Sequence, residues 1–158
     1  MTAVTPAQVR CEALHTCEHF AFTAEAPLDV AWPLFGADRE RAWAPDWHPS
    51  FIWPADALDQ QGMVFTVARG SKTAVWVNTE FDRTAGRIQY VYVLPEVVVT
   101  VITLQLTPLD QATRVAVTYA RTALAETSND VVRGMAAEDR VAGREWALQI
   151  NTYLRRES

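Results

Sequence analysis

The hydrophobic pattern of the chain changes near residue 127, where short apolar segments give way to one long amphipathic stretch. At a helical period of 3.6 residues, the apolar positions from Thr127 to about Arg155 form one stripe, and most of the arginines fall on the opposite face. Asp139 interrupts this stripe near its centre. The pattern predicts a long C-terminal helix that packs against the rest of the protein and carries one carboxyl group on its inner side.

The preceding sequence predicts a β-sheet. A strand is expected from Leu14 to Thr23, then a short helix starting at Pro27, then a second short helix and an extended turn within 39–54. Five further strands, rich in Val, Thr, Tyr and Phe, are expected at Gly62–Arg69, Thr73–Asp82, Arg87–Leu94, Val97–Thr107 and Thr113–Thr122. Their short connections favour antiparallel neighbours. A twisted sheet with one long helix to cover it is expected to curl around that helix and leave a cavity.

Composition narrows the class of protein. The 158 residues suit a single domain spanning 1–158, in which residues 1–13 show no clear pattern and form a loose or packed arm. A net charge of -5 without a basic stripe argues against nucleic acid as a partner. The longest apolar run, Val97–Leu104, is too short for a membrane span. No signal peptide is recognisable, and two cysteines make no disulfide framework, so a cytoplasmic location is expected.

The alternation of side chains along the strands predicts which residues face the helix. On the strand 73–82, periodicity assigns Val75, Val77, Thr79 and Phe81 to the interior, which leaves Trp76, Asn78, Glu80 and Asp82 on the surface. Tyr90, Tyr92 and Tyr119 lie on apolar strand faces that are expected to meet the helix. Buried tyrosine hydroxyls require partners, and a polar group of a ligand or a bound water would serve.

The chain resembles the START-like or SRPBCC superfamily, which includes polyketide cyclases, lipid-transfer domains and pollen-allergen-like proteins. The resemblance rests on the order of elements and on four segments: Ala26–Trp32, Trp43–Trp47, Phe81–Asp82 and Thr127–Arg155. It implies an α+β helix-grip fold, in which a curved antiparallel β-sheet wraps around a long C-terminal α-helix, with two short helices after the first strand. It also implies a hydrophobic pocket, and it carries over no catalytic residue.

Candidate ligand-binding residues follow from these assignments. They are Asp139, Met135, Trp146, Tyr90, Tyr92, Tyr119, Trp53 and Trp47. Asp139 is the candidate polar anchor, and it is expected to have a raised pKa or to be held by a tyrosine or by an arginine such as Arg69 or Arg121. A structural ion pair is an equally weighted alternative for Asp139.

A metal site is not expected. His15, Cys17 and His19 alternate along the first predicted strand, so their Cα atoms are about 6.6 to 6.8 Å apart in sequence order and their side chains do not converge on one ion. Cys11 lies upstream of them. Motifs for nucleotide binding and for metalloprotease chemistry are absent from the sequence, and no cofactor is expected.

Three functions remain open at this point. The preferred one is binding or transport of a small hydrophobic or amphipathic ligand, such as a lipid, a quinone or a polyketide-like molecule. The alternative is a cyclase or dehydratase that resembles polyketide cyclases, with Asp139 and Tyr90 or Tyr92 steering proton transfer. A further alternative is a protein-interaction module similar to chaperone activators. The apolar strand Val97–Leu106 also leaves room for a homodimer.

Overall fold

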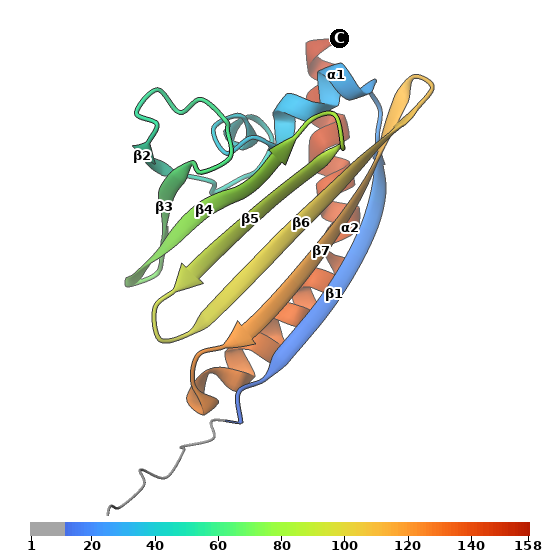
Figure 1. The fold of residues 1–158 in the computed structure, drawn as a ribbon. Coiled ribbons are helices and arrows are strands. Elements are labelled where there is room, and N and C mark those ends of the chain that lie inside the picture. The colour runs from blue at the N-terminus through green and yellow to red at the C-terminus, as the bar shows by residue number, and fades with distance from the viewer. Residues whose placement is uncertain (1–11) are drawn as a thin grey trace, which may run out of the picture.

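A seven-stranded antiparallel sheet curves around one long helix in the computed structural model, which describes residues 12–158 (Figure 1). The strands are β1 (His15–Ala24), β2 (Ser50–Trp53), β3 (Val64–Arg69), β4 (Lys72–Asp82), β5 (Arg87–Leu94), β6 (Val98–Leu109) and β7 (Ala112–Ala123). Their order in the sheet is β1-β7-β6-β5-β4-β3-β2, so β1 crosses to the far edge and pairs with β7. The predicted fold class and all the predicted strands are confirmed, with shifts of one to two residues at most ends.

The connection between β1 and β2 contains the short helices. These are α1 (Leu28–Ala31) and two 3₁₀ turns, η1 (Trp32–Phe35) and η2 (Arg39–Ala42). Pro27 precedes the first turn, as its fixed φ favours. The remainder of the predicted extended turn contains β2, a short edge strand that the sequence pattern did not indicate.

The C-terminal helix α2 (Asn129–Glu157) lies against β1 and β7 and follows a 3₁₀ turn, η3 (Glu126–Ser128). It begins two residues after the predicted start at Thr127. Ser128 occupies the cap position, and its hydroxyl donates to the Glu96 carbonyl oxygen rather than to the helix. Asp130 does lie in the first turn, where the helix dipole favours an acid. None of the helices within 12–158 is long and apolar enough to cross a membrane.

Gly143 brings α2 close to β1. A Cβ atom at Gly143 would lie 2.9 Å from Cδ2 and 3.1 Å from Cβ of Phe20, a distance that packed carbon atoms do not adopt. Gly143 therefore makes room for Phe20.

The predicted faces of β4 are wrong over most of the strand. Val75 is 42% exposed, whereas Trp76 is 5% and Asn78 is 0% exposed. A register irregularity between Asn78 and Glu80 opposite β5 then moves the alternation by one residue, so Phe81 packs on the core while Glu80 stays outside. The alternation of side chains expected for a strand predicts the correct face for each residue after the bulge and the opposite face before it.

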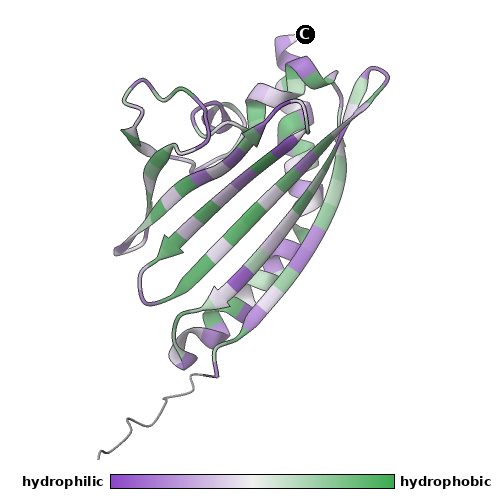
Figure 2. Cartoon of the chain, in the orientation of Figure 1, coloured by the Kyte–Doolittle hydropathy of each residue, from purple (hydrophilic) through white to green (hydrophobic). Residues whose placement is uncertain are grey.

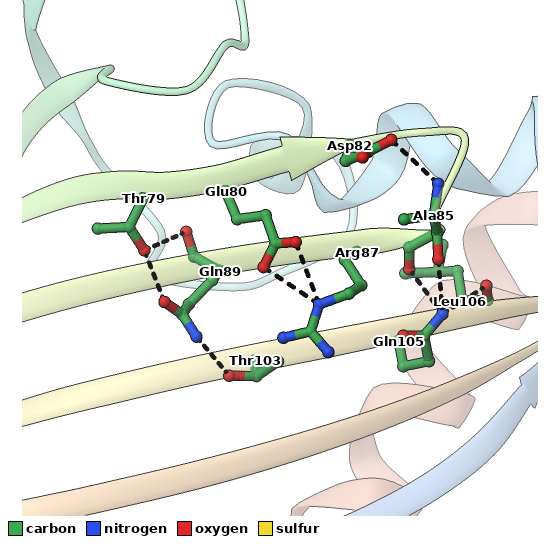
Figure 3. A network of polar contacts seen from close by, with 10 residues as sticks. Thr79, Glu80, Asp82, Ala85, Arg87, Gln89, Thr103, Gln105 and Leu106 are labelled. Atoms are coloured by element: carbon green, nitrogen blue, oxygen red, sulfur yellow. Dashed lines mark hydrogen bonds and ion pairs between the residues drawn. The ribbon is translucent and has the colours of Figure 1, made fainter.

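The outer surface next to this bulge is held by polar contacts between neighbouring strands (Figure 3). The Thr79 hydroxyl donates to Oε1 of Gln89 at 2.9 Å, and Nε2 of Gln89 donates to Thr103 at 3.1 Å. Glu80 pairs with Arg87 at 3.1 Å. Figure 2 shows the corresponding alternation of hydropathy along the strands. These contacts lie on the outside of the sheet, and the inner face is left for aromatic side chains.

Candidate ligand-binding site

A cavity of about 280 Å³ lies between the inner face of the sheet, the η2 segment and the C-terminal half of α2. Eight of the eighteen lining residues have aromatic side chains. The aromatic lining residues are Phe35, Trp43, Trp47, Trp76, Tyr90, Tyr92, Tyr119 and Trp146, with Ile102 and Leu104 beside them. The charged lining residues are Glu40, Asp46, Arg69, Arg121 and Glu145. Mostly apolar walls with a few convergent polar groups are typical of small-molecule sites.

The segment after η2 supplies the outer wall. Nε1 of Trp43 donates to the Leu34 carbonyl oxygen and Nε1 of Trp47 donates to the Ala37 carbonyl oxygen, each at 2.7 Å. Between the two tryptophans, Asp46 has a φ of 60°, which turns the chain back. The two indole groups are thereby fixed to the backbone of the preceding turns and present their rings to the interior.

The rings of this wall pack against one another. Trp43 and Trp146 meet edge to face at 5.3 Å, and Trp76 stacks on Tyr92 at 4.4 Å. Trp47 contacts Trp76 edge to face at 5.2 Å. Such pairs contribute about 0.5 to 1.5 kcal/mol each beyond the area that they bury. The wall is therefore rigid and joins β4, β5, the η2 segment and α2.

Arg121 of β7 forms the polar floor of the cavity. Its Nε and Nη2 donate to the two carboxylate oxygens of Asp139 at 2.6 and 2.8 Å, and both side chains are buried. Its Nη1 donates to the Tyr92 hydroxyl at 2.5 Å and to Thr100 at 3.0 Å. Burial opposes the charge on Arg121, but the contacts with Asp139 and Tyr92 together outweigh this effect, and the pKa of the guanidinium is raised. Asp139 is thus held by an arginine, one of the two states expected for it.

Two tyrosine hydroxyls in the cavity differ in their partners. The Tyr90 hydroxyl donates to the Phe35 carbonyl oxygen at 3.0 Å. The Tyr119 ring lies 4.8 Å from the guanidinium carbon of Arg121, and its hydroxyl has no hydrogen-bond partner within residues 12–158. Burial raises the pKa of both hydroxyls, so both are protonated at neutral pH and can donate.

Glu40 brings a carboxyl group to the cavity from η2. Glu40 is half-buried, and its carboxylate forms no ion pair or hydrogen bond with any described residue. Burial raises the pKa of Glu40 from 4.5 to about 8, while the charge of Arg69 opposes the shift and that of Asp59 adds to it. A carboxyl in this setting exchanges a proton near neutral pH, as acid–base groups in functional sites do.

The structure brings together most of the predicted site residues. Tyr90, Tyr92, Tyr119, Trp146 and Trp47 line the cavity. Asp139 lies behind Arg121, and Met135 touches Arg121 through its sulfur at 3.7 Å, but neither is part of the lining. Trp53 is 51% exposed in β2 and does not line the cavity. Whether the lining residues bind a ligand stays a prediction.

Thirteen of the eighteen lining residues are outside the predicted set, and Arg121, Trp76, Glu40 and Trp43 are the most informative of them. Arg121 was considered only as an end-of-strand partner for Asp139, and Trp76 was assigned to the outer face because of the inverted register. Glu40 and Trp43 lie on one 3₁₀ turn, where the Glu40 carbonyl oxygen accepts from the Trp43 backbone amide at 3.2 Å. Their spacing of three residues places both side chains on one side of the turn, a signal that could have been read.

The histidines and the cysteine of β1 are placed apart from this site. Cys17 is exposed, and Nδ1 of His15 hydrogen-bonds Thr122 at 2.9 Å. Cys11 and most of the predicted arm, residues 1–13, lie outside the described residues. Within 12–158, three or more His, Cys, Asp or Glu side chains nowhere gather in a way that could hold a metal ion.

The fold places the chain among helix-grip proteins. No protein-family model matches the sequence, and no curated protein matches it either. Similarity is found with solved structures, and at these low identities it shows the fold, which is the one expected from the resemblance to the START-like or SRPBCC superfamily.

Three solved structures illustrate this similarity. A norcoclaurine synthase from Thalictrum flavum, in complex with dopamine and hydroxybenzaldehyde, has a TM-score of 0.68 at 11% identity, over 100% of this chain and 98% of that chain. The Zhui aromatase/cyclase from Streptomyces sp. R1128 has a TM-score of 0.65 at 14% identity, over 92% and 97%. The Mll3558 protein from Rhizobium loti has a TM-score of 0.62 at 17% identity, over 87% and 99%.

Proposed function

We propose that this protein binds a small aromatic molecule in the cavity between the sheet and α2. The observation that supports this most strongly is the wall of eight aromatic side chains around about 280 Å³ of space. An apolar cavity of about 150 Å³ accommodates benzene, so this one suits a molecule of one or two rings. The similar structures include proteins that act on or bind aromatic molecules, as their names state.

The wall favours a flat ligand over a flexible chain. Ring faces and edges from Trp43, Trp76, Trp146 and Tyr92 are held in place by mutual packing, and few rotatable bonds remain to adapt the shape. The free Tyr119 hydroxyl and the Glu40 carboxyl would supply polar contacts at defined points. Among the ligand classes expected from the sequence, these features support a polyketide-like or quinone-like ring system more than a lipid chain.

Calorimetric titration of the protein with 2-naphthol tests this proposal. We expect saturable binding at one site per chain. The variant Ile102→Trp fills the cavity and is expected to abolish binding, because Ile102 lies on the lining. Its matched control is Val101→Trp, one residue earlier on β6 and on the outer face of the sheet. Equal binding by the two variants, or no binding by the wild type, would refute the proposed site.

An enzyme of the cyclase or dehydratase type is the second candidate. A specific observation favours it: Glu40 and Tyr119 are two titratable groups that line one cavity, and neither the Glu40 carboxyl nor the Tyr119 hydroxyl forms a hydrogen bond or ion pair with another described side chain. Glu40 would accept a proton and Tyr119 would donate a hydrogen bond to a carbonyl oxygen. Carrier and enzyme are distinguished by incubating a bound aromatic ketone in deuterated water. Exchange of its α-hydrogens that is lost in Glu40→Gln indicates the enzyme, and absence of exchange with retained binding indicates the carrier.

A further inference from the structure

The charges around the cavity carry information about the ligand. Three acidic residues line it, Glu40, Asp46 and Glu145, and they face two arginines, Arg69 and Arg121. Asp46, Glu145 and Arg69 are exposed and form the rim, while Glu40 and Arg121 lie inside. A ligand must complement the charge that remains on these groups after the ion pairs and hydrogen bonds between protein side chains are taken into account.

Arg121 is not available as a receptor for an anion. Its charge is compensated by the bidentate contact with Asp139, and Nη1 is engaged by Tyr92 and Thr100. A carboxylate ligand would have to displace Asp139, whose carboxylate already accepts two hydrogen bonds from the Arg121 guanidinium. The Arg121–Asp139 ion pair at the floor of the cavity therefore carries no net charge.

Glu40 is the acidic group inside the cavity that no described cation pairs with. No described cation lies within ion-pair distance of its carboxylate, and Arg69 acts on it only from the exposed end of β3. The rings of Trp43 and Trp146 flank the same space, and the faces of such rings attract cations. Aromatic faces beside a free carboxylate are the chemistry that recognises an ammonium group.

Resting on the proposed function, we infer that the ligand is a small aromatic amine or quaternary ammonium compound, bound as a cation with Glu40 as its counter-ion. The rim supports this, because Asp46 and Glu145 outnumber Arg69 and the chain carries a net charge of -5. The inference excludes fatty acids and other carboxylates as ligands.

The proposed pairing of a cation with Glu40 makes the affinity for that cation depend on pH. The charged and titratable groups around Glu40 are Arg69 on β3, Asp59 in the loop before β3, Tyr90 on β5, and Tyr119 and Arg121 on β7, with Asp46 and Glu145 at the rim of the same cavity. In the empty cavity the pKa of Glu40 is about 8, so a cation must displace a proton at lower pH. The affinity for a permanent cation should then fall about tenfold between pH 9 and pH 7.

Calorimetry on the full chain with three probes tests the inference. Benzyltrimethylammonium is the cation, 2-phenylethanol the neutral probe and 3-phenylpropanoate the anion. At pH 9 we expect the cation to bind at least tenfold more tightly than the anion. Glu40→Gln should weaken cation binding about tenfold, remove its pH dependence and leave 2-phenylethanol binding within twofold. The control Glu138→Gln, on the exposed face of α2, should change none of these values.

A second variant keeps the test independent of how well Glu40→Gln folds. Arg69→Gln removes the cation that competes for Glu40 and should strengthen benzyltrimethylammonium binding several-fold. Binding of 3-phenylpropanoate equal to that of the cation, or no effect of either variant on cation binding, would overturn the inference. If 2-phenylethanol and 2-naphthol still bind in that case, the proposed aromatic site stands and its charge preference is wrong. If no probe binds, both proposals fail.

Discussion

Replacing Glu40 by glutamine should stabilise the protein increasingly as the pH rises. The pKa of Glu40 is 4.5 as an ordinary carboxyl and about 8 in the folded state, because burial disfavours its charged form. The folded state therefore holds the proton more tightly than the unfolded state. Stability from this proton is fully present below pH 4.5 and is lost as the pH rises through about 8. Glutamine keeps the shape of the neutral acid and does not titrate.

The magnitude follows from the size of the shift. Between the two pKa values, each pH unit changes the free energy of unfolding by about 1.36 kcal/mol for one proton. From pH 5 to pH 7 this sets a limit of about 2.7 kcal/mol for a carboxyl that is wholly removed from water. Glu40 is half-buried, and water reaching its carboxyl reduces the effect. We expect the stability difference between Glu40→Gln and the wild type to grow by about 1 to 2 kcal/mol over this range.

Urea unfolding at pH 5, 6, 7 and 8 measures this difference, with Glu138→Gln as the control for removing a carboxyl from an exposed site. Contributions from all other titrating groups cancel in the comparison with the wild type at each pH. A difference that stays constant from pH 5 to pH 8, or that changes equally in the control, would show that the Glu40 carboxyl is solvated in the empty cavity.

Three further substitutions test the packing around the cavity. Asp139→Asn should lower the free energy of unfolding by about 3 kcal/mol with or without ligand, because it leaves the buried charge of Arg121 without its partner; a normal melting temperature would contradict this. Gly143→Ala should destabilise by about 1 to 3 kcal/mol in urea despite its gain in helix propensity, because the added methyl group meets Phe20, and a gain in stability would show that β1 moves freely. Val75→Thr should stay within about 0.5 kcal/mol of the wild type, and a larger loss in thermal unfolding would mean that Val75 faces the interior.

The fold was predictable because its signals are repeated along the chain. The amphipathic period of α2 extends over many turns, and each strand from β3 to β7 shows β-forming residues bounded by turn residues. A wrong boundary at one end does not change the element. The order of a strand, short helices, a meander and a long helix then leaves few ways to cover the sheet.

The face of β4 could not be read in the same way. Val75 and Val77 alternate with Trp76 and Asn78, and both sets contain residues that are common inside a sheet. The bulge before Glu80 shifts the alternation within the strand, so a strand-wide count mixes two registers. Tertiary packing decided the outcome, since Trp76 stacks on Tyr92 and Phe65 inside, and no local pattern specifies those partners.

Asp139 and Glu40 differ in how clearly the sequence indicates their buried surroundings. Asp139 was identifiable because a carboxyl group breaks a long apolar stripe, and such a break is costly unless a partner compensates it. Glu40 shows no such break, because it lies in a short 3₁₀ turn rich in charged residues, where a glutamate is ordinary. Its environment is created by β3, β5 and β7, which come much later in the sequence. The carboxyl group that the sequence indicated, Asp139, therefore holds Arg121 at the floor of the cavity, and Glu40, which the sequence did not indicate, is the carboxyl without a partner among the described residues.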